Sequence, residues 1–254
     1  SGAGGMAEGF LQAGLQSAVA TDWDLMAAKT FTHNHPDIPF IQKSISDLSS
    51  KELLDASGFS AGDIDIVAGG PPCQGFSIAG QRITDDPRNE MFLEFGRIVR
   101  DLEPRVFIFE NVRGLTSMQG GNVLNAIKDH FKNLGYKCEW KILNSSDYGV
   151  PQSRPRFILV GTQPELSFDF PEPTHGEASD QSNLFDTGLA PKLTVWDALS
   201  DLPEISQGEG AEEMHHDGNY ENSYQKSRRG RRKPGFIYNH RATRHSERIQ
   251  HRYS

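Results

Sequence analysis

The sequence predicts an α/β fold, with a mostly parallel sheet and helices on both faces. Three observations predict it. Short apolar runs alternate with longer segments of helical periodicity, several of these runs stop abruptly at glycine, proline or acidic residues, and 254 residues are enough to bury a full core. The chain therefore suits one α/β domain, or one domain with an appendage.

In chain order, we expect helices over residues 5–13, 89–102 and 122–134, and strands over 17–21, 64–68, 106–109, 137–143 and 157–160. The helix at 89–102 has apolar residues on one side, namely Phe92, Phe95, Ile98, Val99 and Leu102. The strand at 106–109 stops at Glu110, and the last two strands suit a hairpin-like pair. Residues 162–235 are rich in Gly, Pro, Asn, Ser and acids, which predicts extended loops with a short helix near 195–199.

The strand at 64–68 leads directly to a cysteine. Two glycines and then Pro71 and Pro72 follow it, and successive prolines cannot continue a ladder because they lack the N–H donor. Cys73 therefore lies on a stiff loop at the carboxyl end of a strand, where open α/β sheets hold their ligands. A free cysteine is also often a small buried hydrophobe, and the residues of this loop alone leave both interpretations open.

The chain begins with a glycine-rich turn that leads into the first helix. Backbone N–H groups at such a turn can approach an anionic group, and an acid at the end of the next strand, here Asp22, can bind a ribose diol. The same geometry serves dinucleotides and S-adenosylmethionine. A tight structural turn is the alternative.

Charge is unevenly distributed along the chain. The net charge is −8, yet residues 226–254 contain ten Lys or Arg against one acid, Glu247. The segment 226–233 can neutralise phosphates without reading sequence, or it can be a solvated flexible tail.

No apolar run is long enough to span a membrane, no signal peptide is visible, and two cysteines far apart suit neither a disulfide framework nor zinc. We therefore expect a cytosolic protein. The histidines at 33, 35, 215, 216, 240 and 245 lack ligand partners at metal spacing, so we expect surface histidines and no metal site.

Five motifs recur in a characteristic order: Ser1-Gly-Ala-Gly-Gly-Met6, Asp22-Trp23, Pro71-Pro-Cys-Gln-Gly-Phe-Ser77, Glu110-Asn-Val112 and Gln152-Ser-Arg-Pro-Arg156. Together they resemble the cytosine-C5 DNA methyltransferases, densely up to residue 161 and thinly beyond it. The resemblance implies a Rossmann-like, S-adenosylmethionine-dependent methyltransferase fold. It implies a catalytic and cofactor-binding domain over 1–161 whose first strand is missing. Residues 162–254 would be a loop-rich extension leading toward an absent target-recognition domain.

The resemblance also assigns a cofactor site. The turn of Ser1, Gly2, Gly4, Gly5 and Met6 would cradle S-adenosylmethionine. Asp22 would bind the ribose hydroxyls, Trp23 would stack on adenine, Ile45 would close the other face of adenine, and Pro72 would line the methionine end. Ser44 stands where the family commonly has an Asp that reads the adenine amino group, so discrimination there is expected to be weaker.

The chemistry needs a nucleophile because cytosine C5 is not reactive enough to attack a methyl donor. Cys73 would add to C6 while Glu110 holds the N3 edge and the exocyclic amine. By resemblance, Arg154 lies closest to the cytosine, and Gln152 and Arg156 order the pocket. Taken singly, Glu110 could be an ordinary strand-end acid, and the two arginines, two apart and on one side of a strand, could be edge charges.

A target base inside a duplex cannot be reached, so this assignment implies base flipping, with 74–89 as a loop able to close over the pocket. The expected partner is double-stranded DNA, in a bacterial restriction-modification or orphan enzyme of the cytoplasm or nucleoid. The chain would be an excerpt of a longer enzyme, or one subunit of a split enzyme whose second subunit supplies target recognition. The alternatives are a tRNA cytosine-C5 methyltransferase and a non-catalytic DNA- or cofactor-binding remnant.

Overall fold

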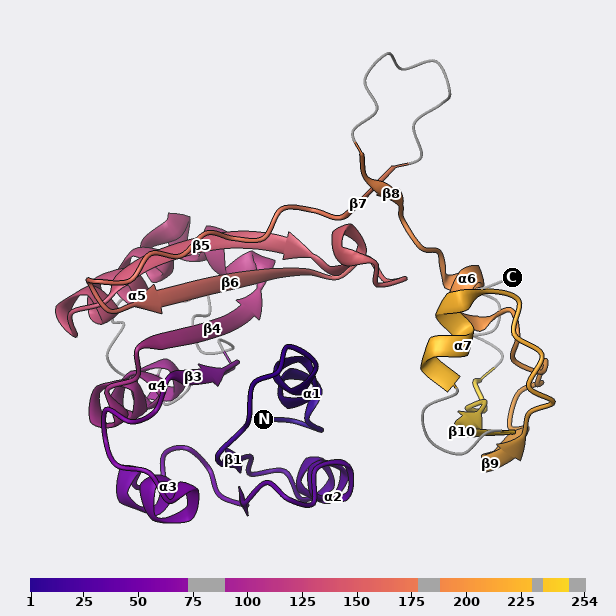
Figure 1. Cartoon of the computed structure of the whole chain (residues 1–254), viewed down its shortest axis with the longest axis horizontal. Coiled ribbons are helices and arrows are strands. Elements are labelled where there is room, and N and C mark those ends of the chain that lie inside the picture. Colours follow the sequence, from indigo (N-terminus) through magenta and orange to yellow (C-terminus); the bar gives the residue numbers. More distant parts are fainter. Residues whose placement is uncertain (73–89, 178–187, 230–234, 247–254) are drawn as a thin grey trace. The chain divides into compact units, whose positions relative to one another are not determined.

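The computed structural model describes residues 1–72, 90–177, 188–229 and 235–246. These residues form two compact units. The first joins Ser1–Leu143 to Pro155–Pro171, and the second joins Asn144–Arg154 to Glu172–Ser254. Figure 1 labels most of the helices and strands, and each unit is described by itself.

The first unit contains the α/β part of the chain. Its elements are α1 (Gly5–Gln12), β1 (Ala20–Thr21), α2 (Leu25–Asn34), β2 (Phe40–Ile41), α3 (Ser50–Ser57), β3 (Ile66–Gly69), α4 (Glu90–Leu102), β4 (Val106–Val112), η1 (Arg113–Gly121), α5 (Asn122–Asn133), β5 (Lys137–Asn144) and β6 (Pro155–Thr162). Four strands form a sheet in the order β3-β4-β6-β5, and β1 pairs with β2 in a separate parallel pair. Strand β3 runs parallel to β4, whereas β4 and β6 are antiparallel.

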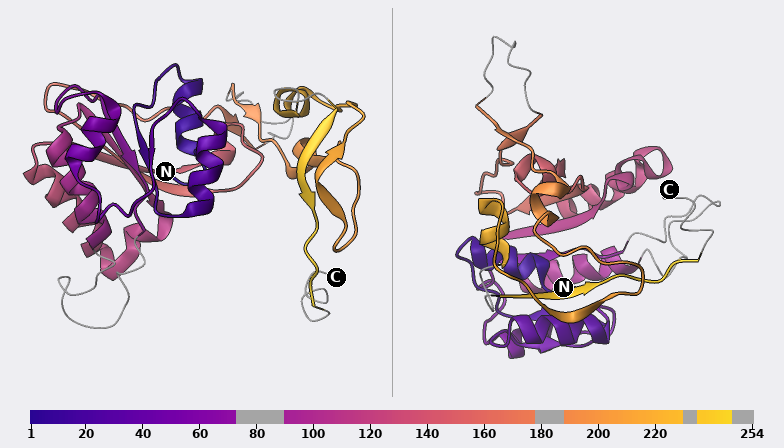
Figure 2. Two further views of the ribbon diagram at one scale, coloured as in Figure 1. Left: turned by 90° about the horizontal axis from the view of Figure 1, so that it is seen from below. Right: turned by 90° about the vertical axis from the view of Figure 1, so that its right-hand side faces the viewer.

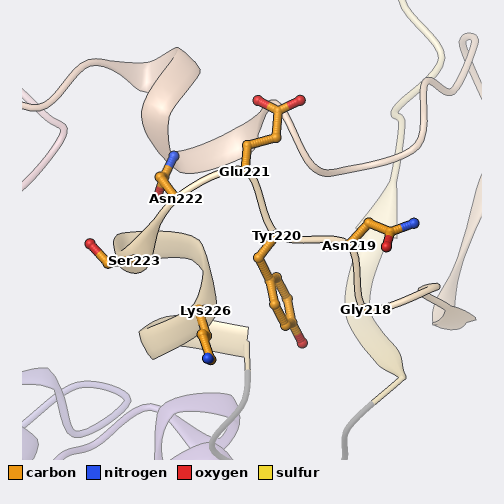
Figure 3. Close-up of a pocket in the computed structure, with 7 residues that line it drawn as sticks. All are labelled: Gly218, Asn219, Tyr220, Glu221, Asn222, Ser223 and Lys226. Atoms are coloured by element: carbon orange, nitrogen blue, oxygen red, sulfur yellow. The ribbon is translucent and has the colours of Figure 1, made fainter.

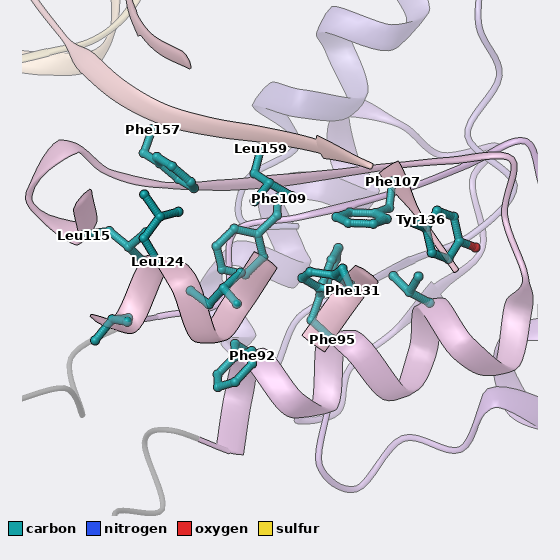
Figure 4. Packing of buried hydrophobic residues seen from close by; sticks show 13 residues of the cluster. Phe92, Phe95, Phe107, Phe109, Leu115, Leu124, Phe131, Tyr136, Phe157 and Leu159 are labelled. Atoms are coloured by element: carbon teal, nitrogen blue, oxygen red, sulfur yellow. The ribbon is translucent and has the colours of Figure 1, made fainter. Parts of the chain in front are cut away.

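The main core lies between this sheet and two helices (Figure 4). Apolar side chains of α4 and α5 pack against aromatic and aliphatic residues of β4 and β6. The largest fully buried members of this cluster are Phe107, Phe109, Phe131, Phe157, Leu115, Ile127 and Leu159. Full burial of each such side chain contributes about 1.5–3 kcal/mol. In the left view of Figure 2, α4 and α5 lie on one side of the sheet and the indigo helices α1 and α2 on the other. The predicted α/β class is therefore confirmed.

A second cluster joins α4 to the N-terminal part of the unit. It is built from Leu48, Leu53, Ile98 and Leu102, with Ile45 and Val67 among the half-buried residues packed on it. Ile45 follows β2, and Val67 lies in β3. The β1-β2 pair and the four-stranded sheet are therefore joined by one apolar cluster.

The predicted helices and strands of this unit are present with small shifts in their bounds. Two differences matter. Strand β4 does not stop before Glu110 but continues to Val112, so that Glu110 and Asn111 lie within a strand. Two helices were not predicted, although both are well capped: Asp24 accepts a hydrogen bond from the Ala27 N–H, and Ser49 forms a capping box with Glu52.

The second unit contains shorter elements. They are η2 (Ser145–Tyr148), β7 (His175–Gly176), β8 (Ala190–Pro191), α6 (Val195–Leu199), β9 (Gly210–His215), α7 (Ser223–Arg229) and β10 (Phe236–Arg241). Helix α6 lies where it was predicted. The expectation of extended loops was wrong for β9, which pairs with β10 in an antiparallel hairpin, and for α7.

A polar core holds α6 and α7 of this unit together. The guanidinium of Arg229 donates to both carboxylate oxygens of Asp201, at 2.6 and 2.7 Å, and the Asp201 side chain is fully buried. His216 accepts the Gly218 N–H at Nδ1, so its Nε2 donates to the Asp201 carbonyl. Gln225, also fully buried, donates to Ser200 Oγ and accepts the Glu221 N–H. Buried polar groups stabilise a fold only when satisfied in this way.

This core corrects two expectations. His216 is buried and not a surface histidine. Arg229 is engaged by Asp201, so it does not belong to a free basic tail. Of the segment 226–233, the first four residues lie in or at the end of α7, and 230–234 lie outside the described residues.

His130 gives the first unit an acid-sensitive point. Its buried Nε2 has no hydrogen-bond partner among the described residues, and the ring packs edge-on against Phe92 where Gly96 leaves space for it. Burial, and secondarily the positive charge of Arg100, lowers the pKa of His130 below 6.5.

We therefore predict that the free energy of unfolding falls as the pH drops below about 6.5. Below this pH His130 binds a proton in the unfolded chain but stays neutral in the folded chain, because its pKa is lower there. His130→Leu should flatten this decline between pH 7.5 and pH 5 in urea unfolding followed by circular dichroism. The matched control is His33→Leu, at an exposed histidine of α2, which should leave the decline in place. An unchanged slope in the His130 variant would refute the assignment.

Candidate active site

The carboxyl end of β3 lies against the functional part of β4. The two strands pair in register from Ile66 opposite Val106 to Gly69 opposite Phe109, so the next residues, Gly70 and Glu110, leave the paired region together. A Cβ at Gly70 would lie 2.7 Å from Oε2 of Glu110. Glycine is therefore required here so that the backbone entering the cysteine loop can approach the carboxylate.

A buried amide holds the start of the same loop. Asn111 is 6% exposed, and its Nδ2 donates to the Pro71 carbonyl at 2.9 Å. Its Oδ1 accepts the N–H of Val112 at 2.9 Å. Pro71 is buried and Pro72 is exposed. Cys73 comes directly afterwards and, like the predicted closing loop 74–89, lies outside the described residues.

Glu110 has a cationic partner on the neighbouring strand. Arg156 lies in β6, opposite Val112 in the antiparallel register, and its Nε lies 2.9 Å from Oε1 of Glu110. Both side chains are between a quarter and a third exposed. Arg156 also donates from Nη1 to the Pro155 carbonyl. The ion pair thus fixes one carboxylate oxygen of Glu110 and leaves the other next to Gly70.

The other two predicted catalytic residues belong to the second unit. Gln152 and Arg154 precede β6, and both are exposed. The Arg154 N–H donates to Oδ1 of Asn144 at 2.8 Å, and Ser145 Oγ donates to the Gln152 carbonyl at 3.1 Å. Arg154 lies one residue before β6 and Arg156 lies within it, so the expectation that both belong to one strand was wrong.

Two of the predicted cofactor residues, Gly2 and Asp22, meet where β1 and β2 end. These strands are parallel, with Thr21 paired to Ile41, so their carboxyl ends meet at one edge. Thr21 Oγ1 donates to the Ile41 carbonyl at 2.8 Å. Asp22 follows directly and accepts the Gly2 N–H at 2.7 Å and the Asp24 N–H at 3.0 Å. The Ser1 amino group donates to the Thr21 carbonyl.

These bonds set the charge state of the acid. Burial by itself would raise the pKa of Asp22, but hydrogen bonds from the backbone N–H groups of Asp24 and Gly2 favour the ionised carboxylate and lower the pKa below 3.8. Asp22 is therefore ionised at neutral pH and can accept hydroxyl donors.

Helix α1 begins at this edge. Its N-cap, Gly4, has φ +100°, and a Cβ there would lie 2.8 Å from the His35 ring, so both the backbone and the packing require glycine. Among the described residues no side chain caps the first turn, which leaves the N–H groups at Gly5 and Met6 available to a ligand. His35 is buried against Phe31, with ring centroids 4.9 Å apart, which corrects the expectation of a surface histidine.

The two residues expected to flank adenine have different environments. Trp23 is 73% exposed. Ile45 is half-buried on the two apolar clusters, and Ser44, whose Oγ lies 2.8 Å from Ser46 Oγ, precedes it.

Several other features of the described residues do not contribute to this site. The described residues contain no group of side chains able to hold a metal ion and no helix long and apolar enough to cross a membrane. A shallow pocket of the second unit is lined by Gly218, Asn219, Tyr220, Glu221, Asn222, Ser223 and Lys226 (Figure 3). Burial raises the pKa of the half-buried Cys138 thiol to about 11, so it is protonated at neutral pH.

Sequence reasoning assigned no role to Asn111, Gly70 or Thr21. A signal existed for Asn111, because it is a polar residue that follows the apolar run 106–109 closely, and a polar group buried there must find a partner. Nothing in the sequence indicated which backbone carbonyl the amide would contact.

Comparison with known proteins agrees with this geometry. The profile of the family described as C-5 cytosine-specific DNA methylase matches residues 1–254. Type II methyltransferase M.AquIA of Picosynechococcus is 42% identical over 214 residues, which cover 80% of this chain and 86% of that protein. M.DdeI of Desulfomicrobium norvegicum is 36% identical, over all of this chain and 59% of its own length. Against several such relatives the chain spans about half of their length.

Solved structures show the same fold. A prophage-encoded E. coli protein described as a DNA modification methyltransferase superposes over 100% of this chain and 72% of its own, with a TM-score of 0.75 and 26% identity. Spodoptera frugiperda DNMT2 superposes over 68% of this chain and 50% of its own, with a TM-score of 0.54 and 27% identity. The predicted methyltransferase fold is therefore confirmed, and the chain belongs to the C-5 cytosine-specific DNA methylase family.

Proposed function

We propose that the protein containing this chain is a DNA (cytosine-5) methyltransferase that uses S-adenosylmethionine and a covalent adduct on Cys73. The observation that carries the proposal is the junction of Gly70, Pro71, Glu110 and Asn111. The backbone that leads into Cys73 is bonded to the strand that carries an arginine-paired carboxylate. The segment that leads to the proposed nucleophile therefore contacts the strand that carries the proposed acid.

The proposed chemistry follows from these groups. The Cys73 thiolate adds to C6 of a cytosine swung out of the duplex, and electron density moves toward C5 and N3. Glu110 in its protonated form donates to N3 and accepts a hydrogen bond from the exocyclic amine, so that the charge developing at N3 is stabilised. S-adenosylmethionine, when bound, supplies the methyl group that C5 accepts. Loss of the C5 proton then restores the C5=C6 double bond and expels Cys73.

Arg156 would orient Glu110 through the pairing at 2.9 Å, which leaves Oε2 to face the base. Arg154, with Gln152 beside it, would contact the cytosine. In the second unit the exposed Lys226 and Arg228 on α7 are suited to DNA phosphates.

The cofactor would bind at the edge formed by β1, β2 and α1. The ionised Asp22 would accept the ribose hydroxyls, and the uncapped N–H groups after Gly4 would face the amino-acid end. Trp23 and Ile45 would enclose adenine, and Pro72 would line the path from this edge to Cys73.

Cys73→Ala should reduce methyl transfer from labelled S-adenosylmethionine to DNA by a factor on the order of a thousand or more. Cys138→Ala is the matched control and should retain activity, because that thiol is protonated and half-buried. Offering tRNA in the same assay separates the RNA-modifying alternative. Full activity of the Cys73 variant on DNA, or transfer to tRNA alone, would overturn the proposal.

Gly70→Ala should lower kcat by roughly tenfold to a hundredfold, since the new methyl group would displace Glu110 from its place next to the cysteine loop. S-adenosylmethionine binding should be unchanged. The matched control is Gly114→Ala, at an exposed glycine whose added Cβ meets nothing within 4 Å. Equal kcat values for the two variants would mean that the close approach has no catalytic role.

Trp23→Ala should weaken binding of S-adenosylhomocysteine by about tenfold, the scale of one lost base-stacking contact. The melting temperature should stay near that of the wild type, because Trp23 is 73% exposed. Trp196→Ala, at a tryptophan that is 74% exposed on α6, is the control and should bind normally in calorimetry. The stacking role is wrong if both variants bind like the wild type.

A further inference from the structure

Arg97, in the middle of α4, makes direct bonds to the segment between β2 and α3. One of its terminal nitrogens, Nη2, donates to the Ile45 carbonyl at 2.9 Å and to the Leu48 carbonyl at 2.8 Å. The arginine is 47 or more residues away from this segment in the sequence and only a quarter exposed. The guanidinium of Arg97 therefore bridges the backbone at the two ends of residues 45–48.

The other N–H groups of Arg97 fix how the guanidinium is oriented. Nε donates to Glu94 at 2.7 Å, and Nη1 donates to Ser50 Oγ at 3.3 Å. Ser50 in turn donates to Asp101 at 2.6 Å. A planar guanidinium can satisfy several acceptors at once, whereas a lysine ammonium on a flexible stem cannot reproduce that fork.

The far end of the same segment is also anchored. Thr21 donates to the Ile41 carbonyl, and Lys43 pairs with Glu52 of α3. The stretch from Ser44 to Leu48 is thus held on one side by β1, next to Asp22, and on the other by α4. Ile45 lies between these two anchors, and its side chain packs on the apolar clusters.

We infer that Arg97 is a positioning residue for the adenine end of the cofactor site. It acts through the backbone of Ile45 and Leu48 and does not touch the cofactor. This inference rests on the proposed function, because only then does the segment flank adenine. Without Arg97, the Ile45 backbone would be free to move, and adenine would lose one wall of its site while the catalytic groups on β4 and β6 stay in place.

The test compares Arg97→Met with Arg100→Met in the complete protein. Both changes remove one cation from α4. Arg100 also donates to Asp101, but it makes no hydrogen bond or ion pair with residues 44–48 in the part of the chain that the structure describes. Dissociation constants for S-adenosylhomocysteine are measured by calorimetry, and KM and kcat by methyl transfer. Arg97→Met should raise the dissociation constant and KM by about tenfold, as expected for lost charge-assisted hydrogen bonds, with kcat within about twofold of the wild type.

Two further readouts separate positioning from general support of the fold. Hydrogen exchange should become faster at residues 44–48 in Arg97→Met and stay unchanged in Arg100→Met. Arg97→Lys retains the charge and is used if the methionine variant does not fold. It should still raise KM, because the three N–H groups of one ammonium cannot reach Glu94, Ser50 and the two carbonyls together as the guanidinium does.

Unchanged binding in either Arg97 variant, or a fall in kcat at constant KM, would overturn the inference. Binding of S-adenosylhomocysteine to the wild-type protein is measured first. Failure of the wild type to bind would contradict the proposed function and not the role of Arg97.

Discussion

The hydrogen bond from the Asn111 amide to the Pro71 carbonyl is the contact on which the site depends. It is made inside the sheet, where an unsatisfied amide costs about 1–3 kcal/mol, so the loop start cannot leave β4 without a penalty. The register of β3 and β4 brings Gly70 beside Glu110, and the absence of a Cβ at Gly70 lets the two approach. Arg156 then pairs with the carboxylate from the other side. Backbone geometry thus brings the Glu110 carboxylate to the segment that leads into Cys73.

The rest of the first unit extends the same arrangement to the cofactor. The β1 and β2 pair presents Asp22 at its edge, and the apolar layer shared by Ile45 and Val67 joins that edge to the strand before the cysteine. Hydrogen bonds from Arg97 to the Ile45 and Leu48 carbonyls attach the same segment to α4. The segment after β2 is therefore held by a side chain from a helix that is distant in sequence.

Helices and strands with a periodic apolar face were predicted well from the sequence, whereas helices whose buried face is polar were not. Helix α4 and strand β3 were clear because their apolar residues follow one period. Helix α7 was missed because its buried face is polar: Gln225 and Arg229 pack against Ser200 and Asp201, a pattern that looks solvated when read along the chain. The motifs identified the family and supplied the candidate residues of the site. Pairings such as Asn111 with Pro71 depend on strand register, which a single sequence does not specify.

The most direct test of the account is a crystal structure of the complete protein trapped on an oligonucleotide that contains 5-fluorocytosine, with S-adenosylmethionine present. Fluorine at C5 blocks the final elimination, so an adduct accumulates. The account predicts a covalent bond from Cys73 to C6, and a Glu110 carboxylate within about 2.6–3.2 Å of the N3 or exocyclic amine nitrogen of the same base. An adduct on another residue, or a Glu110 carboxylate that points away from the base, would contradict it.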